Sequence, residues 1–282
     1  MNGAPSQDLS AEERAQRATA AEQSKAQSLA AHAARSAMRR AQFAEDARVA
    51  DRFRDIMFAQ FSPDAAKLKQ LAAEHRRLIE ARTQLSPAPS QLRGDRLSPP
   101  TAAAAITRGP PYDETYVTHG QGAETADKNT GAYELRVQSI GNGHQTVGAG
   151  IGFWFASGPG NPAQRFTAVL EFEDDWWDKA TGYVAHNDAR TWLSVWGMAE
   201  NGWVSTSANQ TPTWSDGVGW TEAHQNGESG TANLVTFFNA RPNSAYFCWV
   251  QSAADAYADS GVFGDAFSSI HISNRLAFAT FD

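Results

Sequence analysis

Residues 165–179 read RFTAVLEFEDDWWDK, which passes from an apolar alternation into a run of acids within one segment. Apolar side chains recur there at every second position, the period of a β-strand with one buried face: Phe166, Ala168, Leu170 and Phe172. Three acids share the opposite face of such a strand: Glu171, Glu173 and Asp175. The stretch therefore predicts a strand with a core face and an acidic face.

The same alternation recurs through the second half of the chain. Tyr133, Leu135 and Val137 alternate with charged and polar residues, and similar runs occupy residues 151–155, 246–250 and 270–281. Clusters of Gly, Asn, Asp and Ser separate these runs, without a helical pattern between them. Residues 112–282 are therefore predicted to form an antiparallel β-sandwich or jelly roll.

The first half has a different composition. Residues 1–110 hold 17 Lys and Arg against 12 Asp and Glu, whereas residues 111–282 hold 7 against 19, and all nine Trp lie in this acidic part. Fifteen of residues 11–50 are alanine, and Ser10 with Glu13 forms a capping-box pattern. We expect one long helix over about residues 11–60 and a shorter one over about 64–84.

Such a long alanine-rich helix needs a partner for its apolar stripe. We predict that the stripe includes Ala26, Ala30, Ala33 and Ala37, and that the helices of residues 1–85 form a coiled coil or a helical hairpin, or dock on another protein. Residues 86–111 are rich in proline and are predicted to form a linker. The chain is therefore an α plus all-β, two-part chain: 1–85 for oligomerisation or docking, 86–111 as linker and 112–282 as a Trp-rich sandwich.

The acids of the opening stretch have several interpretations. Carboxylates about 7 Å apart on alternate strand positions suit glycoside hydrolysis, so Glu171, Glu173 and Asp175 are candidate catalytic residues of a hydrolase or lyase. The simpler interpretation is a charged strand end that keeps an edge soluble. Calcium is the third, with Asp174, Asp175 and Asp178, or Asp255, Asp259 and Asp265, as ligands, although neither set has a calcium-loop spacing.

Five tryptophans lie in segments rich in Gly, Asn, Ser, Thr and Asp, which predict long loops at one end of the sandwich: Trp176, Trp177, Trp203, Trp214 and Trp220. Flat aromatic rings beside hydrogen-bonding side chains are typical of sugar-binding sites. Burial against a neighbouring subunit and ordinary loop packing are the alternatives. These five residues are the candidate ligand-binding residues.

Other chemistry is not indicated. The histidines lack zinc-site spacing, no phosphate-binding loop is present, and basic residues are interspersed with acids rather than clustered for nucleic acid. We expect no membrane span and synthesis in the cytoplasm without a classical signal peptide, with a released or surface assembly as the destination left open.

The sequence favours a non-enzymatic structural or attachment protein. The helices would mediate self-assembly as a homo-oligomer or dock on a partner protein, and the acidic sandwich would contact a partner or a glycan. Two alternatives stay open, a jelly-roll glycoside hydrolase or lyase and a plain carbohydrate-binding module. The sequence does not decide whether the protein is an enzyme.

Overall fold

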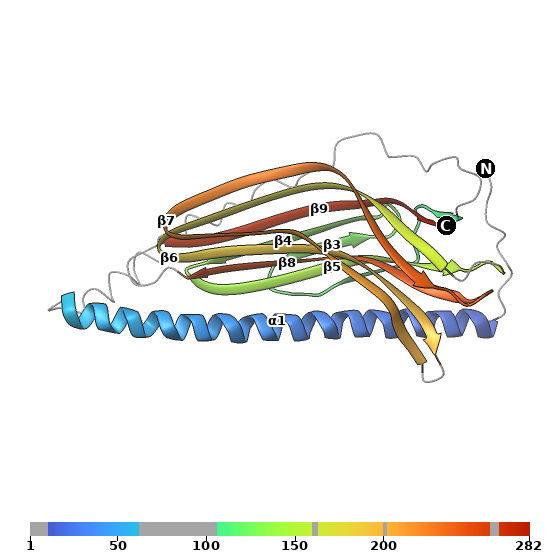
Figure 1. Ribbon diagram of the computed structural model, residues 1–282, viewed down its shortest axis with the longest axis horizontal. Helices are drawn as coiled ribbons and strands as arrows, with labels where there is room; N and C mark the ends of the chain where they lie inside the picture. Colours follow the sequence, from blue (N-terminus) through green and yellow to red (C-terminus); the bar gives the residue numbers. More distant parts are fainter. Residues whose placement is uncertain (1–10, 62–105, 160–162, 200–201, 260–264) are drawn as a thin grey trace.

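The computed structural model describes residues 11–61, 106–159, 163–199, 202–259 and 265–282, which form one helix and nine strands (Figure 1). The helix, α1, spans Ala11–Phe61 and confirms the predicted long helix. The strands are β1 (Ile106–Arg108), β2 (Glu114–Val117), β3 (Ala123–Asp127), β4 (Ala132–Ile140), β5 (Asn142–Ala156), β6 (Ala163–Ala199), β7 (Gly202–Asn239), β8 (Ala245–Asp259) and β9 (Asp265–Phe281).

All the strand pairs are antiparallel, and the two longest strands, β6 and β7, run through both halves of the sandwich. The first half of β6 pairs with β9 and its second half with β8, while β4 pairs with β9 and β5 with β8. One layer therefore has the order β4-β9-β6-β7 and the other β5-β8-β6-β7, which is the jelly-roll order. The predicted antiparallel β-sandwich is confirmed.

Two further strands extend the layers. β3 pairs with β4 at the edge of the first layer, and β2 pairs with β5 at the edge of the second. β1 pairs with the last residues of β9, so Ile106–Arg108, inside the predicted linker, is part of the sandwich. Most of that linker and the predicted helix over 64–84 lie outside the described residues.

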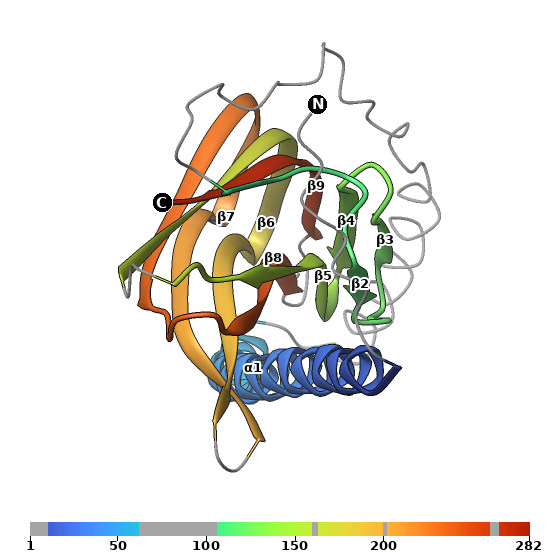
Figure 2. The same cartoon turned by 90° about the vertical axis from the view of Figure 1, so that its right-hand side faces the viewer.

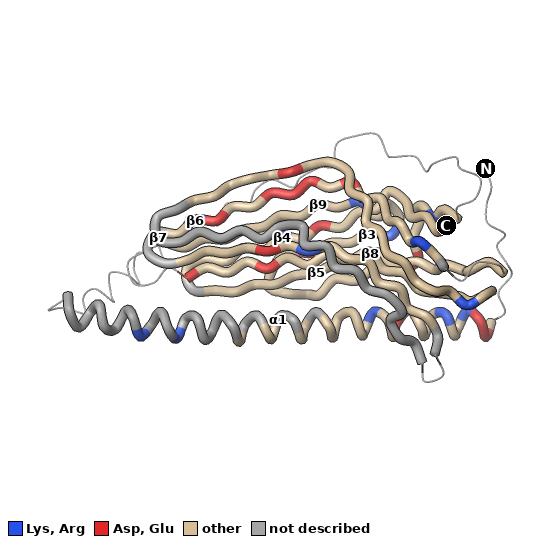
Figure 3. Tube along the Cα trace, in the orientation of Figure 1, with Lys and Arg blue, Asp and Glu red and all other residues tan. Residues whose placement is uncertain are grey.

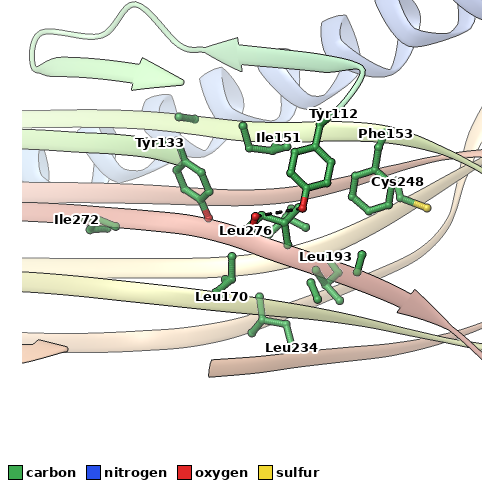
Figure 4. Close-up of a cluster of buried hydrophobic side chains, with 14 of the residues drawn as sticks. Tyr112, Tyr133, Ile151, Phe153, Leu170, Leu193, Leu234, Cys248, Ile272 and Leu276 are labelled. Carbon is green, nitrogen blue, oxygen red and sulfur yellow. Dashed lines mark hydrogen bonds between the residues drawn. The ribbon is translucent and has the colours of Figure 1, made fainter. Parts of the chain in front are cut away.

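The core lies between the two layers (Figures 2 and 4). Phe155 on β5 stacks on Phe281 of β9 with ring centroids 3.9 Å apart, and Phe281 stacks on Phe166 of β6 at 4.9 Å. These rings join one layer to the other. The alternation that predicted each strand is confirmed, because Tyr133, Leu135 and the other residues of that parity are buried.

Strand β8 departs from simple alternation, because nearly all of its residues are buried. Cys248 and Val250 face the core between the layers, whereas Phe247 and Trp249 face outward and are covered by α1. A strand buried on both faces reads as a continuous apolar run. The helix therefore supplies a third layer over β5 and β8, which Figure 2 shows below the strands.

The contacts of α1 correct the prediction for this helix. Ala20, Ala21, Ser24 and Ser28 are its buried residues, and the helix packs through this part on the sandwich of the same chain rather than on another helix. The predicted stripe of Ala26, Ala30, Ala33 and Ala37 is exposed. The described helix lacks an apolar stretch long enough to cross a membrane.

The burial of Cys248 makes a simple test of the core. Its side chain is fully buried, and this burial raises the pKa of the thiol, so that neither access nor ionisation favours reaction. We expect no labelling by a thiol reagent such as DTNB in the folded protein at pH 8. One equivalent should react after denaturation in guanidinium chloride. Rapid labelling of the folded protein would contradict the assigned register of β8.

Candidate carbohydrate-binding face

The outer surface of the β4-β9-β6-β7 layer presents side chains that the strand register places in rows. The first row consists of register partners on four adjacent strands: Gln138 on β4, Ser269 on β9, Trp177 on β6 and Gln225 on β7. Partners in antiparallel strands point to the same face. The row therefore places one indole among two amides and a hydroxyl.

Two parallel rows follow along the strands. Arg136, His271, Asp175 and Gly227 form the second, and Glu134, Ser273, Glu173 and Ser229 the third. We call these three rows the polar face. Successive outward residues of a strand lie about 7 Å apart, so the three rows extend about 14 Å along the strands, a length comparable with two or three sugar rings.

Trp177 is the large apolar side chain of the polar face that solvent reaches. It is 39% exposed, and its ring packs against Phe267 on β9 with centroids 4.7 Å apart at an interplanar angle of 59°. Phe267 itself is buried. A tilted ring contact of this kind holds the indole in place and leaves part of its surface free to contact a ligand.

The acids of the polar face have defined neighbours. Glu171, next along β6, forms an ion pair with its register partner Arg275 on β9, and both are largely buried. Asp175 contacts the Nδ1 atom of the buried His271 at 3.0 Å. Glu173 has serines as register partners on both sides, Ser273 and Ser229. The predicted acidic face of Glu171, Glu173 and Asp175 thus exists, and its members have different surroundings.

These acids do not lie on an exposed sheet edge. β6 is flanked by β9 on one side and β7 on the other throughout residues 166–181. The interpretation of the opening stretch as an acidic strand end that protects an edge is therefore wrong. The acids belong to the middle of a layer, where they form part of an outer surface.

The other residues of the acidic run point into the sandwich. Asp174, Trp176 and Asp178 share the parity of Phe172, and all three are buried. The amide of Asn187, on the second half of β6, donates a hydrogen bond of 2.6 Å to Asp178. Burial raises the pKa of Asp174 to about 8, although the backbone N–H of Ser273 donates to its carboxylate and opposes the shift. Continued alternation beyond Phe172 was the sequence signal for these interior acids.

A buried polar network lies deeper in the same core. The Tyr133 hydroxyl is 3.0 Å from that of Ser252, which is 2.8 Å from the Thr191 hydroxyl. The Asn274 amide donates to both Tyr133 and Ser252. The network joins β4, β6, β8 and β9, so it ties together the two layers with directional contacts. Its polar atoms are hydrogen-bonded, as buried polar groups require.

The five predicted ligand-binding tryptophans are separated. All lie on strands β6 and β7 rather than in loops, which corrects the predicted loop placement. Trp176 is part of the core cluster and Trp177 is exposed on the polar face. The side chains of Trp203, Trp214 and Trp220 lie outside the described part of the structure, so their role in binding stays a prediction.

The predicted calcium ligands also divide. Strand alternation puts Asp175 on the outer surface, away from Asp174 and Asp178 in the core. Within the described residues, no group of three His, Cys, Asp or Glu side chains is arranged to hold a metal ion. Asp255 and Asp259 share β8, and the side chain of Asp265 is not described. Calcium binding stays a prediction that chelation followed by thermal melting would test.

Comparison with known proteins identifies no family. No family model and no curated protein matches the chain. Solved structures give distant matches, among them a β-sandwich carbohydrate-binding module (11% identity, 56% of this chain and 54% of that chain, TM-score 0.22) and the xylan-binding CBM22-1 domain of Paenibacillus barcinonensis Xyn10C (10% identity, 61% and 93%, TM-score 0.19). Tailspike protein 4 of bacteriophage CBA120 matches at 14% identity over 59% of this chain and 18% of its own, with a TM-score of 0.18. The chain spans about half of the first structure and less than a fifth of the tailspike. Scores this low carry no argument about function.

The buried Asp174 predicts a pH-dependent stability. Its pKa is about 8 in the folded protein against an ordinary value of 3.8, so the folded chain keeps a proton that the unfolded chain loses between these values. Stability should therefore fall as pH rises from about 4 to 8. In Asp174→Asn this loss disappears. We expect urea unfolding at pH 8 to show a gain over the parent on the order of a few kcal/mol, which shrinks toward pH 4.

Glu173→Gln is the matched control, because Glu173 is an adjacent acid of the same strand that faces outward. It should leave the difference between pH 4 and pH 8 close to that of the parent. Parallel pH dependences for Asp174→Asn and the parent would show that Asp174 is ionised in the fold.

Proposed function

We propose that the protein is a non-enzymatic attachment or binding protein whose polar face binds a glycan. The observation that carries the proposal is the row of Gln138, Ser269, Trp177 and Gln225. An indole ring offers a flat apolar surface to the C–H face of a sugar, and amides and hydroxyls on both sides can hydrogen-bond its hydroxyl groups. Rigid strands hold these groups at fixed spacing, which lowers the entropy cost of binding.

The charge of the face favours a neutral glycan. Glu134, Glu173, Asp175 and the ion-paired Glu171 lie in or beside the three rows, and Asp and Glu recur along β6 and β7 (Figure 3). Carboxylates accept hydrogen bonds from sugar hydroxyls but repel phosphate, sulfate and uronate groups. The ligand class is therefore a neutral oligosaccharide of two or three exposed sugar rings rather than a nucleic acid or an acidic polysaccharide.

The positions of the acids favour binding over hydrolysis. A glycosidase needs a carboxylic acid that stays protonated near the operating pH and touches the glycosidic oxygen. The acid whose pKa is raised, Asp174, is 4% exposed and points into the core. Glu171 on the polar face is paired with Arg275. The proposal therefore assigns the outward acids to hydrogen bonding with the ligand.

The hydrolase alternative has a direct test. A panel of neutral polysaccharides incubated with the parent protein should release no new reducing ends above the level of a heat-denatured sample. Release by the parent that is lost in both Glu171→Gln and Glu173→Gln, with unchanged thermal melting, would replace the binding proposal by a hydrolytic one.

Assembly through the N-terminal helix completes the proposed function. An attachment protein with a flat, shallow binding face gains strength from several copies, because linked faces bind a repeating glycan with an avidity that exceeds the single affinity. The predicted homo-oligomer, or a partner protein held by the helix, would supply these copies. A place in a released or surface assembly stays a prediction.

Trp177→Ala should remove most of the glycan affinity. Loss of a stacking indole costs about 1.4 kcal/mol or more, which is about a tenfold rise in Kd. The first step is a screen of neutral oligosaccharides with the parent, and the best ligand is then titrated by calorimetry against both proteins.

Phe237→Ala is the matched control, since Phe237 is 70% exposed on β7 and lies beside Arg165 at the far end of the same layer. It should bind as the parent does. Equal loss in the two variants, or unchanged affinity of Trp177→Ala, would exclude the polar face as the site.

A further inference from the structure

The surface of the sandwich opposite the polar face carries a second set of aromatic side chains. Phe247 on β8 has Trp154 of β5 and Trp196 of β6 as register partners, so three rings form one row across three strands. Trp249 and Tyr116 lie beside this row, with ring centroids 5.2 Å apart. We call this set the aromatic platform: Tyr116, Trp154, Trp196, Phe247 and Trp249.

Helix α1 fits this platform through a stripe of small residues. Ala20, Ala21, Ser24 and Ser28 follow the 3.6-residue period and are buried. The indole N–H of Trp249 donates to the Ser24 hydroxyl at 3.1 Å, and the Arg17 guanidinium lies 5.5 Å from the centre of a Trp154 ring. Small side chains let the helix approach the rings closely, so the pairing is specific in shape and in hydrogen bonding.

The fit involves a small part of a long helix. Of the 51 residues of α1, Arg17–Leu29 contains those that the structure shows in contact with the platform. The exposed side of the helix includes Ala26 and Ala30, and further along Met38 is 66% exposed. The position of α1 therefore depends on a short contact that another copy of the platform could provide equally well.

The length of the connection from helix to sandwich makes docking within one chain costly. Figure 1 shows that α1 begins near the end of the sandwich where the C-terminus lies and finishes at the opposite end. β1 pairs with the C-terminal residues, so the chain must return over a distance close to the helix length, about 75 Å for 51 residues. Residues 62–105 number 44, and a flexible chain of 44 residues has a relaxed span of about 36 Å.

An antiparallel pair of copies removes this mismatch. In such a pair, the end of one sandwich that lies far from its own C-terminus is beside the C-terminal end of the other. A helix docked on the neighbour would then finish next to β1 of its own chain, and the connection would not need to return along the sandwich. Reciprocal docking closes the pair, as an exchanged element does in two-fold dimers.

We propose that α1 docks in exchange, with the Arg17–Leu29 part of each helix on the aromatic platform of a second copy of this chain. The proposal rests on the assembly role within the proposed function and gives it a structural form. Two copies joined in this way use the same contacts as the single chain, and both polar faces stay on the outside.

A complementation experiment tests the exchange with the full chain. Ala20→Arg puts a long cation into the buried stripe of the helix, and Trp154→Lys removes a ring of the platform and repels Arg17. Each variant alone should be a monomer of 30.5 kDa by size exclusion with light scattering, whereas the parent has twice that mass. Mixing the two variants should restore the doubled mass, because the intact helix of Trp154→Lys docks on the intact platform of Ala20→Arg.

Ala26→Arg, on the exposed side of α1, is the matched control and should keep the mass of the parent. A parent that stays at 30.5 kDa at about 0.1 mM, or a mixture that stays monomeric, would overturn the exchange. Circular dichroism verifies that each variant is folded, and Trp249→Phe, which removes the hydrogen bond to Ser24 and keeps a ring, serves in place of Trp154→Lys if that protein does not fold.

The outcome is separable from the glycan proposal. Trp177→Ala should keep the doubled mass, and Ala20→Arg should keep the single-site affinity for an oligosaccharide, because the platform and the polar face lie on different layers. A monomeric parent that binds oligosaccharide would overturn the exchange alone. A doubled parent without oligosaccharide binding would overturn the glycan proposal alone.

Discussion

Strand β6 is the constraint on which the sandwich depends. Its 37 residues pair with β9 first and β8 afterwards, while β7 follows it on the other side throughout. Because alternate side chains point to opposite faces, the register of one strand sets both the core and the outer surface of both layers. A slip of one residue would send Glu171, Glu173 and Asp175 into the core. The irregularity between Thr181 and Val184 lies where the strand passes from one layer to the other.

The acidic run illustrates how this alternation separates chemistry. Outward acids stay in contact with water and with basic or hydroxyl neighbours, whereas Asp174 in the core has a pKa raised to about 8 by loss of hydration. Acids with such different properties follow one another along the chain. The outward set suits hydrogen bonding to a ligand, and the inward set makes the stability of the fold depend on pH.

The two outer surfaces of the sandwich have different roles in this view. The β4-β9-β6-β7 layer carries the polar face, and the β5-β8-β6 layer carries the aromatic platform with α1 over it. Binding on one layer and assembly through the other do not compete for the same residues. An assembly built through the helices would therefore present several polar faces at once, which is the condition for avidity on a repeating glycan.

The sequence by itself determined the long helix, the change to strand periodicity and the face shared by Glu171, Glu173 and Asp175, because these follow from local propensity and from the strand period of two. Tertiary structure decided that β6 is an interior strand, that Trp176 is core while Trp177 is exposed, and that α1 lies on Trp249 and Phe247. These depend on which strands become neighbours and on what covers each face. Pairing between segments far apart in the chain leaves no periodic signal in either segment alone.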